Sequence, residues 1–166
     1  TIDLAFFTMS ESERVSQTKF RCQLISQEEI VLCAPKKGHY ELLAKEEPGR
    51  KYPWIDLKYL ENDCFLLLKK QMRLGQLAVK LLEEQAISPR VVELSSIDTA
   101  LSLVARQYGI AFASSFRIEE HETAENLSFF CFGSHPEAWD FVAAYGKEHL
   151  LTPPEGYLIE LIGSLY

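Results

Sequence analysis

Hydroxyl side chains stand where this sequence changes from a strand pattern to a helix pattern. Ser95 and Ser96 follow a short apolar strand, and after them a helical stripe begins: Ile97, Ala100, Leu101, Val104 and Ala105. Free backbone N–H groups and the positive end of the helix dipole gather at such a junction, which suits a small anion such as a carboxylate. The segment running to Thr99 could therefore bind an anion. Alternatively, Ser95 or Ser96 does no more than cap the helix.

A second group of side chains follows another strand. Lys69, Lys70 and Arg73 come directly after the apolar run at residues 64–68. In open α/β sheets, ligands bind at the carboxyl ends of the strands. Cations are unfavourable at a helix N-terminus, and this favours a functional role over a merely solvated helix start, although both remain open.

Patterns typical of catalysis are missing from the sequence. It has no G-x-S-x-G, no glycine-rich phosphate loop, no H-E-x-x-H and no G-x-G-x-x-G. We expect the histidines to be solvated surface residues: His39, His121, His135 and His149. The adjacent carboxylates Glu28–Glu29 and Glu119–Glu120 should point apart and form no acid–base pair. No catalytic residue and no cofactor are expected, so the chain is not predicted to be an enzyme.

The cysteines show neither C-x-x-C spacing nor a nearby histidine at ligand spacing: Cys22, Cys33, Cys64 and Cys131. Cys22, Cys33 and Cys131 lie in strand-like apolar runs, where we expect buried free thiols and no metal. Reduced thiols fit a cytoplasmic protein.

Strand and helix patterns alternate along the chain. Strands are expected at residues 2–7, 20–25, 29–34, 64–68, 91–94, 110–113, 127–132 and 139–145. Helices are expected at residues 74–82, 96–105 and from 153 to the end, with a loop over 8–17 and irregular chain over 36–63 that holds a helical turn near 56–60. Alternation predicts the α/β class, and the continuously apolar strands favour sheets with mostly parallel pairing.

Two helix ends carry recognisable signals. Thr152 and Glu155 form a capping box around Pro153, and Gly109 is placed to end the helix that begins after Ser96. The final helix should bury Leu158, Leu161, Ile162, Leu165 and Tyr166.

The charge balance excludes one class of partner. Lys+Arg number 17 against Asp+Glu 24, which gives a net charge of −7. Such an acidic chain repels phosphate backbones, so it should not bind nucleic acid by itself. No apolar run approaches the roughly 20 residues of a membrane span, and no signal peptide is visible.

The order of segments resembles the effector-binding domain of LysR-type transcriptional regulators. Segments that carry the resemblance are Ile2-Asp3-Leu4-Ala5-Phe6, Leu24 through Leu32, Lys37-Gly38-His39-Tyr40-Glu41-Leu42, Ile55 through Leu60, Phe65 through Leu68, Ile87 through Glu93, Ser96-Ile97-Asp98-Thr99, and Val104 through Ser115. The chain departs from the family pattern at Tyr40, where a proline is usual, and at Gln107, where a glycine is usual. The resemblance covers essentially the whole chain.

The resemblance implies a two-lobed fold like a type 2 periplasmic binding protein, with mixed, mostly parallel sheets and an incomplete lobe I. Lobe I would hold residues 1–34 and 138–166, and lobe II residues 35–137. The first strand and helix of lobe I, and the DNA-binding domain, would lie upstream. The effector would bind in the inter-lobe cleft, on residues that the resemblance places there: Thr8, Leu68, Lys69, Ser95, Ser96 and Thr99.

The sequence is thus interpreted as a ligand sensor that controls transcription in a longer, homo-oligomeric regulator. Its effector would be a small carboxylate or another small anion, and DNA would be bound only by a domain absent from this chain. A solute-binding protein of a transporter is the alternative reading, and an enzyme on the same fold is a third. A signal peptide upstream would favour the transporter, and a helix-turn-helix the regulator.

Overall fold

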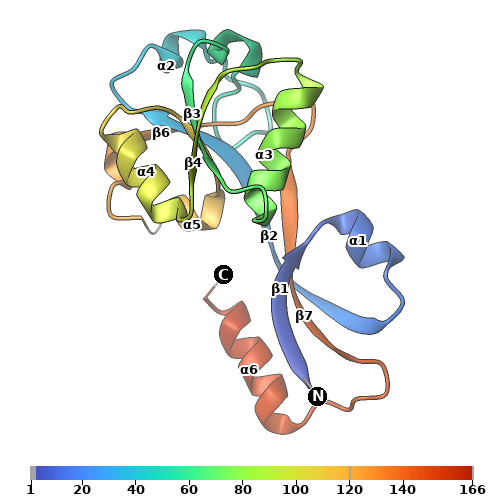
Figure 1. Cartoon of the computed structure of the whole chain (residues 1–166). Coiled ribbons are helices and arrows are strands. Elements are labelled where there is room, and N and C mark those ends of the chain that lie inside the picture. The colour runs from blue at the N-terminus through green and yellow to red at the C-terminus, as the bar shows by residue number, and fades with distance from the viewer. Residues whose placement is uncertain (1–2, 120, 166) are drawn as a thin grey trace. The chain divides into compact units, whose positions relative to one another are not determined.

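The computed structural model describes residues 3–119 and 121–165, and its contacts divide the chain into two units (Figure 1). Unit 1 consists of Thr1–Glu29 and Ala138–Tyr166, and unit 2 of Ile30–Glu137. The chain therefore passes from one unit to the other twice, once inside strand β2 (Phe20–Pro35) and once at the start of strand β7 (Ala138–Gly146).

Unit 1 contains an antiparallel sheet in the order β1 (Leu4–Met9), β7 and the first part of β2. The register of β2 against β7 shifts between Leu24 and Ser26, so the pairing is irregular at this point. β1 is an edge strand that is partly exposed, so the predicted parallel strand with two covered faces is wrong here. Ile2, which was predicted to begin this strand, lies outside the described residues.

A short helix replaces the loop expected over residues 8–17. In α1 (Glu11–Ser16), Ser10 and Glu13 form a reciprocal capping box. The Arg14 guanidinium donates through Nε to Asp140 Oδ2 at 2.5 Å, and Gln27 Nε2 donates to Asp140 Oδ1 at 2.9 Å. Burial raises the pKa of the Asp140 carboxyl, but these two hydrogen bonds and the positive charge of Arg14 outweigh it and leave that pKa below its ordinary value. The helix is thus fastened to the sheet by a buried carboxylate.

The last helix, α6 (Pro153–Gly163), begins as the sequence predicts. The backbone N–H and the hydroxyl of Thr152 donate to Glu155 Oε2 at 2.7 and 2.8 Å, which confirms the capping box. The predicted buried stripe is wrong, because Leu158 and Leu161 are 41% and 44% exposed while Ile159 between them is buried. Tyr166, also assigned to that stripe, lies outside the described residues.

Unit 2 contains the second part of β2, which pairs antiparallel with β5 (Ala111–Ser114) and with β6 (Leu127–Phe130). β3 (Cys64–Leu68) and β4 (Arg90–Leu94) pair in parallel, and a bridge from Phe65 to Ile110 joins β3 to the chain just before β5. The α/β class is confirmed, but antiparallel pairing predominates among the described strands. The prediction of a parallel majority failed because β2 runs through both units as one strand, and its neighbours return along it in the opposite direction.

Two helices cover β3 and β4 (Figure 1). α4 (Ile97–Ala105) buries Ala100, Leu101 and Val104 against Cys64 and Leu66, as its predicted stripe requires. α3 (Arg73–Glu84) buries Leu74, Ala78, Leu81 and Leu82, which lie in the helix expected at residues 74–82. Shorter elements complete unit 2: α2 (Tyr40–Leu43), η1 (Leu57–Leu60), α5 (Ser115–Glu119) and η2 (Ala124–Asn126).

Gly109 does not have the role that the sequence suggested. α4 ends at Ala105, and the residue with left-handed backbone beyond it is Gln107, at φ 65°. Gly109 instead lies against β3, where a β-carbon would overlap the Cys64 carbonyl oxygen and lie 3.1 Å from Leu66 Cγ. Its missing side chain allows a close approach of two chain segments.

Candidate functional site

The carboxyl ends of β3 and β4 lie side by side. Leu68 is paired with Leu94 in the parallel register, and the Lys69 N–H donates to the Leu94 carbonyl at 3.0 Å. Lys69 and Ser95 therefore leave the ends of neighbouring strands at the same edge of the sheet. Leu68 is buried, whereas Lys69 and Ser95 are exposed. We call this place the strand-end site; it comprises Leu68, Lys69, Ser95, Ser96 and the first turn of α4.

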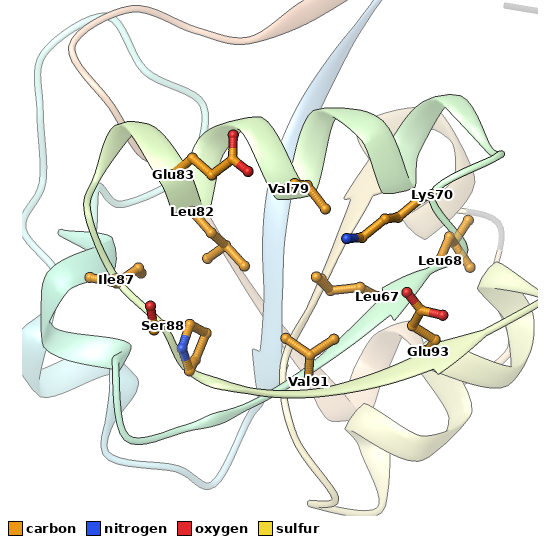
Figure 2. Close-up of a pocket in the computed structure, with 11 residues that line it drawn as sticks. Leu67, Leu68, Lys70, Val79, Leu82, Glu83, Ile87, Ser88, Val91 and Glu93 are labelled. Atoms are coloured by element: carbon orange, nitrogen blue, oxygen red, sulfur yellow. The ribbon is translucent and has the colours of Figure 1, made fainter.

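The chain leaves the two strand ends toward opposite faces of the sheet. Leu66 packs in the cluster that contains α4, and partly buried Leu94 packs against the same cluster. Leu67 and Val91 line a pocket beneath α3 (Figure 2). Side chains alternate between faces along a strand, so α3 and α4 cover opposite faces. A crevice between such diverging connections is the usual location of ligand sites in open α/β sheets.

Ser96 is the N-cap of α4. Its backbone is extended, with φ −139° and ψ 133°, and its hydroxyl accepts from the Thr99 N–H at 3.4 Å. The N–H groups of a first helical turn have no partner within the helix. The long cap bond thus satisfies one of these donors weakly. The hydroxyl of Ser95 is not the cap. Helix capping is therefore the role of Ser96, and Ser95 remains the candidate for anion binding.

Gly75, in the first turns of α3, supports the strand-end site and was not singled out from the sequence. A β-carbon there would overlap the carbonyl oxygens of Leu68 and Lys69 and lie 2.7 Å from the Lys69 carbonyl carbon. Only glycine lets α3 approach the end of β3 this closely. The available signal was a glycine inside a strongly amphipathic helix, where it costs about 1 kcal/mol relative to alanine.

The three basic residues after β3 separate from one another. Lys69 is exposed, and its carbonyl accepts from the Met72 N–H at 2.8 Å. Arg73 begins α3 and is half-buried. Lys70 belongs to a pocket of about 290 Å³ between α3 and β4, where its ammonium points into the pocket above Leu67 and near Val79 (Figure 2). Leu68 forms part of the same pocket.

Thr99 lines a different hollow, of about 330 Å³, together with Asp98, Ser102, Arg106 and His121. The Asp98 carboxylate is held by Arg117 through contacts of 2.7 and 2.9 Å. The prediction that His121 is a solvated surface residue is wrong, because its side chain is 7% exposed. Thr123 Oγ1 lies 2.8 Å from its Nδ1. His149 also departs from that prediction, because its Nε2 contacts Glu155 at 3.0 Å.

Thr8 is the one predicted effector residue that belongs to unit 1. It lies in β1, where its register partner is Phe141, and it is half-buried. Its participation in a ligand site stays a prediction. The remaining predicted residues, Leu68 to Thr99, all belong to unit 2.

Possible metal ligands do not gather in the part of the chain that the structure describes. No cluster of three or more histidine, cysteine, aspartate or glutamate side chains there could hold a metal ion. All four cysteines are free: Cys33, Cys64 and Cys131 are buried, and Cys22 is partly exposed. Burial raises the pKa of the Cys33 thiol, which keeps it protonated. No described helix combines the length and apolar character needed to cross a membrane.

Comparison with solved structures gives the same fold throughout. The regulatory domain of CcmR from Synechocystis PCC6803 in complex with 2-PG is 15% identical, with a TM-score of 0.74 over 98% of this chain and 73% of that one. The BenM effector-binding domain with its effector benzoate is 16% identical, with a TM-score of 0.66 over 98% and 70%. The effector-binding domain of QuiR in complex with shikimate is 17% identical, with a TM-score of 0.63 over 97% and 69%.

At such identities these likenesses establish the fold, which is the type 2 periplasmic-binding-protein fold of LysR effector domains. No curated protein matches the sequence. The family model of the LysR substrate binding domain, however, matches residues 1–165, so this chain belongs to the LysR substrate-binding-domain family.

Proposed function

We propose that this chain is the sensor domain of a LysR-type transcriptional regulator and that it binds a small carboxylate or similar anion at the strand-end site. One observation carries the proposal: β3 and β4 end side by side, and the chain leaves these ends toward helices on opposite faces of the sheet. The exposed hydroxyls of Ser95 and Thr99 and the exposed ammonium of Lys69 supply donors at this edge.

Two terms favour an anion there. The first-turn N–H groups of α4 and its dipole attract negative charge, typically by 0.3–1 kcal/mol per interaction at exposed sites. Lys69 adds a full positive charge, while the nearest acid of that turn, Asp98, is already paired with Arg117. Benzoate and shikimate, named with two of the similar domains, are both carboxylates, which agrees with this choice of ligand class.

In the longer regulator, ligand binding would act by population shift. A ligand moves a conformational equilibrium only by the difference in its affinity for the two states. The acidic net charge of −7 supports a place for DNA binding in another part of that protein, because this chain would repel phosphates. We also propose that the intact regulator is a homo-oligomer.

A thermal-shift screen with inorganic phosphate, benzoate, shikimate and amino acids tests the ligand class. At 100 times its dissociation constant, a ligand adds about 2.7 kcal/mol, or roughly 5–11 °C in Tm for a chain of this size. Ser95→Ala and Thr99→Val should weaken any hit. The matched control is Ser164→Ala, because Ser164 is an exposed serine that follows α6 in unit 1, whereas the strand-end site belongs to unit 2. A hit that survives both substitutions would refute this placement of the site.

A further inference from the structure

The hollow of about 330 Å³ beside α4 shares the first turn of that helix with the strand-end site. Asp98 and Thr99 belong to this turn, and Ser102 and Arg106 follow on the same helix, with His121 opposite them in the sequence order. Residues four apart lie on one face of a helix, so Asp98, Ser102 and Arg106 form one wall. We call this place the α4 hollow. The α4 hollow and the strand-end site therefore have Asp98 and Thr99 in common.

The segment that carries His121 is fixed to the same core as α4. Ile118 in α5 is fully buried and packs in the hydrophobic cluster that contains the buried side of α4. The His121 N–H donates to the Ile118 carbonyl at 3.3 Å, and the His121 carbonyl accepts from the Ala124 N–H at 2.9 Å. Arg117, also in α5, donates to both carboxylate oxygens of Asp98 at 2.7 and 2.9 Å. These contacts hold the imidazole of His121 next to the first turn of α4.

His121 presents an N–H group that has no acceptor. Only 7% of its side chain is exposed, and its Nδ1 accepts from the Thr123 N–H at 3.2 Å. A ring nitrogen that accepts a hydrogen bond carries no proton, so the imidazole proton is on Nε2. Nε2 lies 3.9 Å from Asp98 Oδ1, too far for a hydrogen bond, and no other acceptor for it is found within residues 3–119 and 121–165. A buried donor without an acceptor is unfavourable, so this N–H favours an occupant of the α4 hollow.

The spacing of this N–H and the Asp98 carboxylate suits a hydroxyl group. Because Nε2 and Oδ1 are 3.9 Å apart, an oxygen atom fits between them at about 2.8 Å from each. A hydroxyl can accept from the His121 N–H and donate to Asp98 at the same time. An ionised carboxylate or phosphate has no proton to donate, and Asp98 would repel it. Opposite charges also balance around the hollow, since Arg106 and Arg117 face Asp98 and Glu122.

We propose that the ligand is a hydroxylated carboxylate, with its carboxylate at the strand-end site and a hydroxyl in the α4 hollow between His121 Nε2 and Asp98 Oδ1. This inference rests on the proposed function, because it keeps the carboxylate where that function has it. Asp98 lies in the first turn of α4, so the two groups of the ligand are separated by about one helical turn, roughly 5.4 Å. The hydroxyls of Thr99 and Ser102 line the same hollow and can bind further hydroxyl groups.

Pairs of acids that differ only in their hydroxyl groups test this inference. Shikimate is compared with cyclohex-1-ene-1-carboxylate, and glycerate with propanoate, by calorimetric titration of the whole chain. The hydroxylated acid should bind about 10-fold more tightly in at least one pair. A 10-fold difference is about 1.4 kcal/mol, which is the size expected for one or two hydrogen bonds.

Substitutions in the α4 hollow should remove this preference. His121→Phe deletes the donor and keeps a flat ring, and Asp98→Ala deletes the acceptor; each should lower the preference to less than about 3-fold, as a cycle over protein and ligand measures directly. The matched control is His135→Phe, an exposed histidine of unit 2 outside the hollow, which should keep the full preference. Thermal melts show whether each variant folds. If His121→Phe does not, Asp98→Ala decides, because the side chain of Asp98 is 51% exposed.

The possible failures separate the two proposals. Equal affinities within both pairs, with binding measured, overturn the hydroxyl site and leave the carboxylate site standing. A preference that persists unchanged in the folded variants also overturns it, because the hydroxyl is then bound elsewhere. If none of the four acids binds, the proposed carboxylate site fails, and the hydroxyl site fails with it.

Discussion

The same substitution at two helical glycines should change stability in opposite directions. In Gly75→Ala, the added methyl would lie 2.7 Å from the Lys69 carbonyl carbon, whereas carbon atoms in contact are about 3.5–4.0 Å apart. The neighbouring atoms are backbone, so relief requires α3 and the end of β3 to separate by roughly 1 Å. In Gly156→Ala, nothing lies within 4 Å of the new methyl.

The magnitudes follow from two terms. Overpacking costs about 1–3 kcal/mol, and an overlap with backbone belongs at the upper end, while alanine gains about 1 kcal/mol in helix propensity. Gly75→Ala should therefore lose about 2 kcal/mol, which lowers Tm by roughly 4–8 °C. Gly156→Ala has only the favourable term, about 0.4–1 kcal/mol, and should raise Tm by roughly 1–4 °C.

Urea unfolding and thermal melts of both variants measure these differences. Gly75→Ala should also weaken any ligand found in the screen, because it displaces Leu68 and Lys69, whereas Gly156 lies in unit 1 and its variant should bind normally. Shifts of the same sign in the two variants would refute the close-approach role of Gly75.

Two further predictions concern protonation and thiol reactivity. The backbone N–H and hydroxyl of Thr152, and then His149, lower the pKa of Glu155 to about 2, so its ionised form stabilises the fold above pH about 4 and this contribution disappears as pH falls toward 2. Urea midpoints should show Glu155→Gln less stable at neutral pH, with the difference shrinking below pH 4; a constant difference would contradict the capping role. For the thiols, burial raises the pKa of partly exposed Cys22, but a thiol reagent can still reach it, so one equivalent should react in the folded protein and none in Cys22→Ser. Fast reaction of further thiols without unfolding would contradict the burial of the other three: Cys33, Cys64 and Cys131.

Helix stripes inside unit 2 could be predicted from sequence because each helix packs against a neighbouring strand of that unit. The apolar spacing of α3 and α4 and the Ser96 cap are all local signals, and the structure has them. The spacing in α6 was just as regular, yet it gave the wrong buried face. Periodicity reveals an apolar stripe but not what covers it, because the partner of that stripe is not written in the helix itself.

Pairing direction was harder to predict because it depends on residues far apart in the chain. β2 was interpreted as two strands, divided at the polar stretch Ser26-Gln27-Glu28, and it is one strand of 16 residues shared by both units. That polar stretch does not break the strand: Gln27 bonds Asp140, and Glu28 pairs in register with Trp139. Such long-range partners override local composition.

The proposed strand-end site rests more on the topology of the fold than on side-chain chemistry. The anion donors proposed there are largely backbone N–H groups at the start of α4, which any sequence supplies once the strand and helix are formed. What the sequence must specify is the close approach of α3, through Gly75, and small hydroxyl residues that leave the edge open. These requirements occupy few positions, so domains only 15–17% identical to this chain can share the fold and still differ in the ligand that their side chains select. Side chains that are exposed at this edge, Lys69 and Thr99 above all, are therefore where substitutions should change ligand preference without loss of stability.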